Sequence, residues 1–146
     1  MILNRQRSVR VSVKDLDEFL ARARRVLRLP TESVSICLVS NSDIARWNRA
    51  YRGKKGPTDV LSFRADEENG TRRRTRSGKS AAYLGDIAIA PAVARRNARR
   101  FQRTFGEEMR ILMLHGMLHL MGYDHETDEG QMERREQKLR RTLGLA

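Results

Sequence analysis

The chain has 146 residues, of which 30 are Lys or Arg and 18 are Asp or Glu, so its formal net charge is +12. The chain has a single cysteine, Cys37, which excludes an internal disulfide. The apolar runs of the chain are shorter than the roughly 20 residues needed to span a bilayer. The charged N-terminus is unlike a signal peptide, so we expect a soluble cytoplasmic protein of one domain. Its positive charge favours a polyanion as binding partner. Nucleic acid is the first candidate and an acidic membrane surface is the second.

Hydrophobic periodicity predicts alternating strands and helices in the first half of the chain. In order, these are a strand at 1–13, a helix at 14–29, a strand at 33–40, a short helix capped by Asn41 or Ser42, a turn at 52–57 and a strand at 58–63. Pro30 ends the first helix. The short helix should turn Ile44, Trp47 and Tyr51 inward, and Cys37 should be a small buried apolar group.

The second half is predicted to be mostly helical. A mobile basic loop at about 65–80 precedes a strand at 82–90, a helix from Pro91 to about Phe105, an almost entirely apolar helix at about 107–121 and an amphipathic helix at about 128–143. We therefore predict an α+β single domain over 1–146. It has a four-stranded mixed sheet, about five helices and the apolar helix at its centre.

All three histidines lie in the window HGMLHLMGYDH, residues 115–125. His115 and His119 are four residues apart, so they share one face of the apolar helix. Gly122 can end that helix and let the chain turn back to bring His125 to the same point. Three neutral imidazoles with an open fourth position are typical of a catalytic Zn²⁺ site, although nickel, cobalt or copper could bind the same ligands.

Two other interpretations of this window are open. Core histidines can be satisfied by hydrogen bonds alone, but three of them in an apolar shell would each need a partner. The spacing H-x3-H-x2-G-x2-H is also that of metzincin proteases, which carry a glutamate after the first histidine as general base. This chain has Gly116 at that position, so a metzincin-like hydrolase would lack its central chemical group.

The histidine window, together with NRAYRGKKGPTDVLSF (48–63) and LGDIAIA (84–90), resembles the YbeY family of bacterial endoribonucleases and rRNA maturation factors. Two departures are Arg64, where the family usually has proline, and a more basic loop at 72–79. The resemblance implies a zincin-like, single-strand-specific, metal-dependent endoribonuclease acting in 16S rRNA 3′-end maturation and ribosome quality control. It also implies a zinc-like ion on His115, His119 and His125, and makes Arg52 the family's important arginine.

Roles for single residues follow from phosphodiester chemistry. A metal at His115 can acidify water and polarise a phosphoryl oxygen, and the Arg52 guanidinium can hold two phosphate oxygens. The general base is unassigned, with Asp124, Glu126 and Asp86 as weak candidates. Two basic clusters could bind RNA: Arg72, Arg73, Arg74, Arg76 and Lys79 in the loop, and Arg95, Arg96, Arg99, Arg100 and Arg103 after Pro91. With few aromatic residues to stack bases, backbone contacts should dominate.

Two functions of other classes stay open at this point. One is a ribosome-assembly factor that binds RNA and uses its metal mainly for structure, and the other is a hydrolase of another substrate. For the leading interpretation the expected partners are the 16S rRNA precursor on the small ribosomal subunit, a small-subunit ribosomal protein and an assembly GTPase, with no membrane involved.

Overall fold

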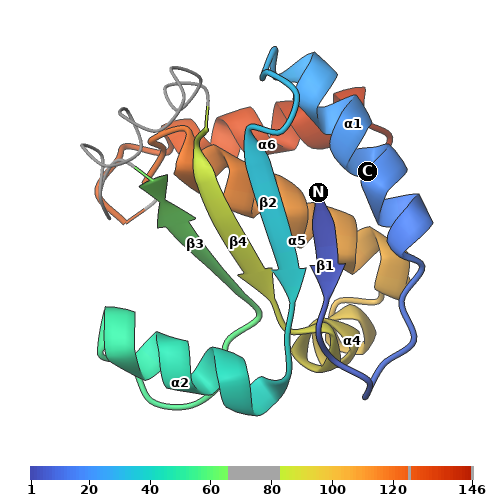
Figure 1. Cartoon of the computed structure of the whole chain (residues 1–146). Coiled ribbons are helices and arrows are strands. Elements are labelled where there is room, and N and C mark those ends of the chain that lie inside the picture. The colour runs from blue at the N-terminus through green and yellow to red at the C-terminus, as the bar shows by residue number, and fades with distance from the viewer. Residues whose placement is uncertain (66–82, 125, 146) are drawn as a thin grey trace.

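One mixed sheet organises the fold (Figure 1), seen here in a computed structural model that describes residues 1–65, 83–124 and 126–145. The strands are β1 (Ile2–Asn4), β2 (Val34–Leu38), β3 (Val60–Arg64) and β4 (Gly85–Ile89). Their order is β1-β2-β4-β3, in which β3 runs antiparallel to β4 and the other pairs are parallel. The helices of the described residues are α1 (Val13–Val26), α2 (Asn41–Arg52), α4 (Pro91–Arg100), α5 (Phe105–Leu120) and α6 (Gln131–Thr142). The predicted α+β fold, with its four-stranded mixed sheet and five helices, is confirmed.

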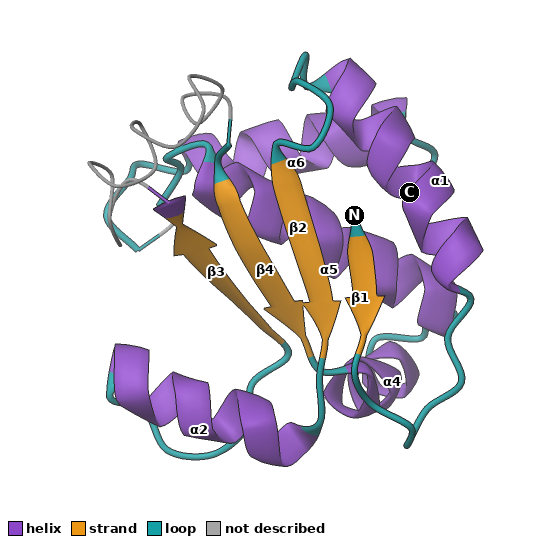
Figure 2. Ribbon diagram, viewed as in Figure 1, coloured by secondary structure: helices purple, strands orange, loops and turns teal. Residues whose placement is uncertain are grey.

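The helices cover the two faces of the sheet unequally (Figure 2). The larger core joins α1, α5 and α6 to one face, where Ile36, Ile87 and Ile89 point. A smaller core joins α2 to the other face through Ile44, with Leu61 of β3 beneath it. Helix α5 contacts β3, β4 and three other helices, so it is the predicted central helix.

The local sequence explains why α5 begins at Phe105 and why the helix is buried. The Thr104 hydroxyl accepts a hydrogen bond from the Glu107 amide at 3.1 Å, and the Glu107 carboxylate accepts one from the Thr104 amide at 2.9 Å. This capping box satisfies two amides that a helix start leaves unpaired. The following residues are apolar on nearly every side, and Met109, Met113 and Met117 are fully buried. A helix of this kind can only lie in the interior.

Several predicted boundaries were wrong. The first strand ends at Asn4 because the Gln6 side chain then bonds the backbone of Val9, at 2.9 and 3.0 Å, in place of a sheet neighbour. Helix α4 ends at Arg100, five residues early, because Gln102 takes a positive φ of 56° and Thr104 starts α5.

Smaller differences concern the other helices. Ser40, not Asn41 or Ser42, caps α2, and Tyr51 is 65% exposed instead of facing inward. Helix α6 starts only at Gln131, because the Asp128 carboxylate first holds the turn by accepting hydrogen bonds from two backbone amides. Cys37 is half-buried. Among the helices of the described ranges, we find none with the length and hydropathy needed to cross a membrane.

Candidate active site

Helix α5 presents His115 and His119 on its half-buried side, toward a cavity of about 600 Å³. Their Nε2 atoms are 3.2 Å apart and their ring planes cross at 78°. Two imidazole nitrogens bound to one tetrahedral Zn²⁺ at about 2.0–2.1 Å lie about 3.3 Å apart. The two rings are therefore spaced as ligands of a single ion.

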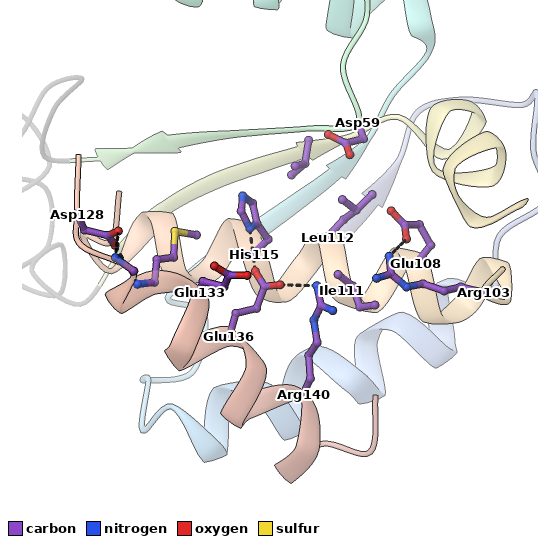
Figure 3. Close-up of a pocket in the computed structure, with 13 residues that line it drawn as sticks. Asp59, Arg103, Glu108, Ile111, Leu112, His115, Asp128, Glu133, Glu136 and Arg140 are labelled. Carbon is purple, nitrogen blue, oxygen red and sulfur yellow. Dashed lines mark hydrogen bonds and ion pairs between the residues drawn. The ribbon is translucent and has the colours of Figure 1, made fainter. Parts of the chain in front are cut away.

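Glu136 of α6 holds the other nitrogen of His115 (Figure 3). Its Oε1 is 2.8 Å from Nδ1 of His115, and its Oε2 accepts a hydrogen bond from Arg140 at 2.5 Å. Burial alone would raise the pKa of this carboxyl, but the hydrogen bond from His115 and the Arg140 charge together lower it, so Glu136 is a carboxylate. A carboxylate at Nδ1 places the proton there and directs the Nε2 lone pair away from Glu136, as in a histidine that binds a metal.

The third expected ligand, His125, lies outside the described residues. Within the part of the chain that the structure describes, no three His, Cys, Asp or Glu side chains are grouped closely enough to hold an ion. The neighbouring residues Asp124 and Glu126 are described, and both line the cavity of His115 and His119. The donor set on α5 fits a transition metal, and the identity of the third ligand stays a prediction.

Gly116, the position where a metzincin has its glutamate, faces the sheet. A Cβ built on Gly116 would lie 2.9 Å from two carbons of Ile87, which is fully buried in β4. The Gly116 carbonyl oxygen also accepts a hydrogen bond from the Ser62 hydroxyl of β3 at 3.2 Å. A side chain at this position would force Ile87 to shift, so glycine lets α5 pack closely against β4.

Arg52 ends α2 at the rim of the same cavity. One of its guanidinium nitrogens is 3.2 Å from Oε1 of Glu126, and both side chains are largely solvent-exposed. The cavity lining combines three carboxylates with three cations besides the histidines: Asp59, Asp124, Glu126, Arg52, Lys54 and Arg64. A phosphate placed near the histidines would therefore have a guanidinium within reach, in competition with Glu126.

The three weak candidates for a general base lie in different surroundings. The Glu126 carboxylate accepts a hydrogen bond from Arg52 at the rim of the cavity. The Asp124 carboxylate instead accepts a hydrogen bond from the Glu126 amide at 3.0 Å, and this bond holds the turn. Asp86 lies on the α2 side of β4, where it accepts a hydrogen bond from the Tyr83 hydroxyl. The sheet separates Asp86 from α5, so the structure does not bring this weak candidate to the cavity of His115 and His119.

The predicted RNA-binding clusters are only partly described. The loop residues Arg72, Arg73, Arg74, Arg76 and Lys79 lie outside the described residues. On α4, Arg95, Arg96, Arg99 and Arg100 are exposed. Arg103 lies beyond the end of the helix. Its Nη1 atom is 2.8 Å from Oε1 of the buried Glu108 carboxylate, so its guanidinium forms an ion pair within the protein.

Two site residues were missed in the sequence. Glu136 follows Met132 by four residues and precedes Leu139 by three, and this spacing puts all three on the buried face of α6. The spacing was therefore a signal that could have identified Glu136 from the sequence.

The second missed residue is Asp59. It lines both the histidine cavity and a second cavity of about 470 Å³ between α5 and α6, and its Oδ2 accepts a hydrogen bond from Asn97 of α4. Its position depends on how distant segments pack, which a local pattern does not reveal.

Comparison with known proteins identifies the family of this chain. The family described as endoribonuclease YbeY matches residues 1–144. Endoribonuclease YbeY of Koribacter versatilis is 37% identical over 99% of this chain and 86% of its own. The protein of that name from Bacillus subtilis is also 37% identical, over 80% of each chain. The solution structure of TM1509 from Thermotoga maritima superposes with a TM-score of 0.63 at 28% identity, covering 98% of this chain and 89% of that one. The match along nearly the whole chain and the identity above 30% show that this chain belongs to the endoribonuclease YbeY family.

Proposed function

We propose that this chain is a single-strand-specific, metal-dependent endoribonuclease whose ion is held by His115, His119 and His125. The family name supports the endoribonuclease activity. The 3.2 Å spacing of two Nε2 atoms in a cavity that Arg52 also lines is the observation that carries the metal site. Zn²⁺ suits three imidazoles best, and nickel, cobalt or copper are the alternatives.

The roles of the residues follow from their positions. A bound ion would supply a Lewis acid and an acidified water. His115 is oriented by Glu136, which keeps its Nε2 atom directed at the ion site. Arg52 can leave Glu126 for a phosphate, because an exposed ion pair contributes only about 0–1 kcal/mol. Its planar guanidinium then binds two phosphate oxygens and stabilises the charge that develops on them.

One experiment separates this enzyme from an RNA-binding assembly factor whose metal is structural. Arg52→Ala and His119→Ala are compared with Arg46→Ala, which removes another exposed arginine of α2 that pairs with Asp43 instead. Metal content, thermal unfolding and cleavage of single-stranded RNA are measured on protein purified without a histidine tag. We expect Arg52→Ala to stay folded and metal-loaded but to lose about 100-fold or more in cleavage rate, as enzymes do when a donor to the transition state is removed.

The alternatives predict other outcomes. If Arg52→Ala and Arg46→Ala cleave alike, and His119→Ala acts only by unfolding the protein, the assembly factor is the better description. A peptide hydrolase is disfavoured because Gly116 leaves no glutamate to serve as general base.

For the biological setting we propose the 16S rRNA precursor on the small ribosomal subunit as substrate, in the cytoplasm. The activity would serve 3′-end maturation and ribosome quality control. A small-subunit ribosomal protein and an assembly GTPase are the protein partners we would test first. The net charge of +12 supports RNA as the partner.

A further inference from the structure

Three aromatic side chains gather between α2 and the edge strand β3. The Tyr51 and Phe63 rings are 5.3 Å apart with planes at 74°, and the Trp47 and Phe63 rings are 6.4 Å apart at 88°. An edge-to-face pair covers one face of one ring only. The Tyr51 ring therefore keeps at least one face that Phe63 does not cover, and Tyr51 is 65% exposed.

These rings line a hollow of about 280 Å³ on the α2 side of the sheet, with Cys37 and Asp86 also on its walls. Its volume is close to the roughly 300 Å³ at which cavities for small organic ligands begin. Its described lining contains one carboxylate, Asp86, and no cation. This lining fits a flat, uncharged ring better than a phosphate.

The aromatic hollow and the histidine cavity lie on the two sides of the edge strand β3, and residues that are neighbours in the sequence line them. Tyr51 is followed by Arg52, and Phe63 is followed by Arg64, and both arginines line the histidine cavity. Successive residues of a strand point to opposite faces of the sheet. Strand β3, at the edge of the sheet, thus carries an aromatic ring on one side and a guanidinium on the other.

We infer that the hollow formed by Trp47, Tyr51 and Phe63 is a stacking site for one unpaired RNA base, whose neighbouring phosphate lies at Arg52 and Arg64. This inference rests on the proposed function and names the part of the substrate that the enzyme holds beside the scissile bond. Stacking on an aromatic ring tolerates any base, because every base has a π-face. A base in a duplex is already stacked and paired, so this site also gives a physical reason for preferring single strands.

The arrangement changes the expectation that backbone contacts dominate the binding of RNA. The chain has only four Phe, three Tyr and one Trp, so aromatic residues are scarce on average. Three of these eight nevertheless lie together, and two of the three directly precede cations of the active site in the sequence. Sequence spacing could not show this, because Phe63 is on β3 and the other two are on α2.

Trp47 is the chain's only tryptophan, so its fluorescence reports on this hollow directly. We expect a short single-stranded oligoadenosine RNA to quench it in the absence of metal, and a fully paired RNA duplex of the same length to quench it far less. Placing one abasic nucleotide along the strand should reduce quenching at a single position. Cys37 gives a second readout, since single-stranded RNA should slow its alkylation. Burial raises the pKa of that thiol, so the alkylation is run at alkaline pH.

Tyr51→Ala should weaken binding of the single strand by about 5- to 150-fold, the range for removal of one stacking aromatic residue. Tyr51→Phe keeps the ring and should bind like the parent protein. Leu3→Ala is the matched control, because Leu3 is 41% exposed on β1, at the opposite edge of the sheet. No charge is removed, so the salt dependence of binding should be unchanged in Tyr51→Ala. Should Tyr51→Ala fail to fold, Tyr51→Leu replaces it.

The inference fails if Tyr51→Ala binds single strands as tightly as Leu3→Ala, or if duplex RNA quenches Trp47 as strongly as a single strand. These outcomes differ from a failure of the proposed function. That failure would appear as absent cleavage by the metal-loaded parent protein, whereas the binding measurements need neither metal nor cleavage.

Discussion

His115 is the residue at which the parts of the candidate site meet. Its Nδ1 faces Glu136, its Nε2 faces His119, and its ring lines both the histidine cavity and the cavity between α5 and α6. Both of its ring nitrogens are therefore committed to neighbours. The orientation of His115, and with it the geometry of the ion site, depends on one carboxylate of a different helix.

Glu136→Gln tests that dependence. Glutamine can still accept the Nδ1 hydrogen bond, but it removes the negative charge that makes His115 a stronger ligand. We expect metal affinity to fall about 10- to 100-fold, measured by competition with a chromophoric chelator. Glu133→Gln is the control, because Glu133 is an exposed carboxylate one turn earlier on α6. Equal affinities in the two variants would show that Glu136 has only a structural role.

At the scale of residues, the sequence identified those site residues whose positions follow from their neighbours in the chain. His115 and His119 could be paired because four residues make about one helical turn, and the resemblance of residues 48–63 pointed to Arg52. Glu136 was missed although its spacing to Met132 places it inward, because a glutamate on a basic helix is ordinarily a surface charge. The sequence could not place Asp86 relative to the histidines, because the alternation of a strand does not tell which face carries the site.

At the scale of elements, the contact of α5 with β4 sets the depth of the histidines. Ser62 donates to the Gly116 carbonyl, and Ile87 lies where a Cβ on Gly116 would project. The glycine costs helix stability, roughly 0.5–1 kcal/mol relative to alanine, so only close packing explains it there. The position that lacks a protease glutamate is thus used for packing instead.

Gly116→Ala is expected to destabilise the protein in spite of alanine's better helix propensity. The added methyl group would press on Ile87, which is fully buried, and overpacking of this kind costs typically about 1–3 kcal/mol. Chemical denaturation followed by circular dichroism measures the free energy of unfolding. Gly106→Ala, in the first turn of the same helix, is the control, because a methyl group there would approach only the end of the Arg110 side chain. A Gly116→Ala protein as stable as the parent would contradict the tight contact.

The presence of helices and strands was predicted better than the residues at which they begin and end. Amphipathic stripes located α1 and α6, and the apolar run located α5, because burial of one face decides such segments. The ends depended on single hydrogen bonds instead, such as those of Gln6 to Val9 and of Asp128 to the amide of Met132. Such bonds between side chains and the backbone compete with regular structure without changing hydrophobic periodicity.

At the scale of the whole molecule, part of the surplus positive charge lies on the exposed face of α4. The exposed arginines of α4 are Arg95, Arg96, Arg99 and Arg100. The amide of Asn97, on the same helix, donates to Asp59, which lines the histidine cavity and directly precedes β3. A strand of RNA crossing α4 would therefore approach the cavity at the end of the sheet where β3 begins.

Replacing these four arginines of α4 by glutamine should have opposite effects on stability and on binding. The pairs Arg95 with Arg99 and Arg96 with Arg100 are four residues apart and repel each other, so the free protein should become more stable by a few tenths of a kcal/mol per pair. Binding of single-stranded RNA should weaken, and the slope of log affinity against log salt should fall by about 0.7 for each phosphate that the variant no longer neutralises.

The control for this variant must remove the same charge elsewhere. Arg7, Arg10, Arg25 and Arg28 are all exposed and lie on α1 or next to it, far along the chain from α4 and β3. Their replacement by glutamine lowers the net charge equally, so it accounts for the long-range attraction that any surplus of positive charge exerts on RNA. If both quadruple variants reduce the salt slope alike, RNA senses only the total charge; a larger reduction in the α4 variant places phosphates on that helix.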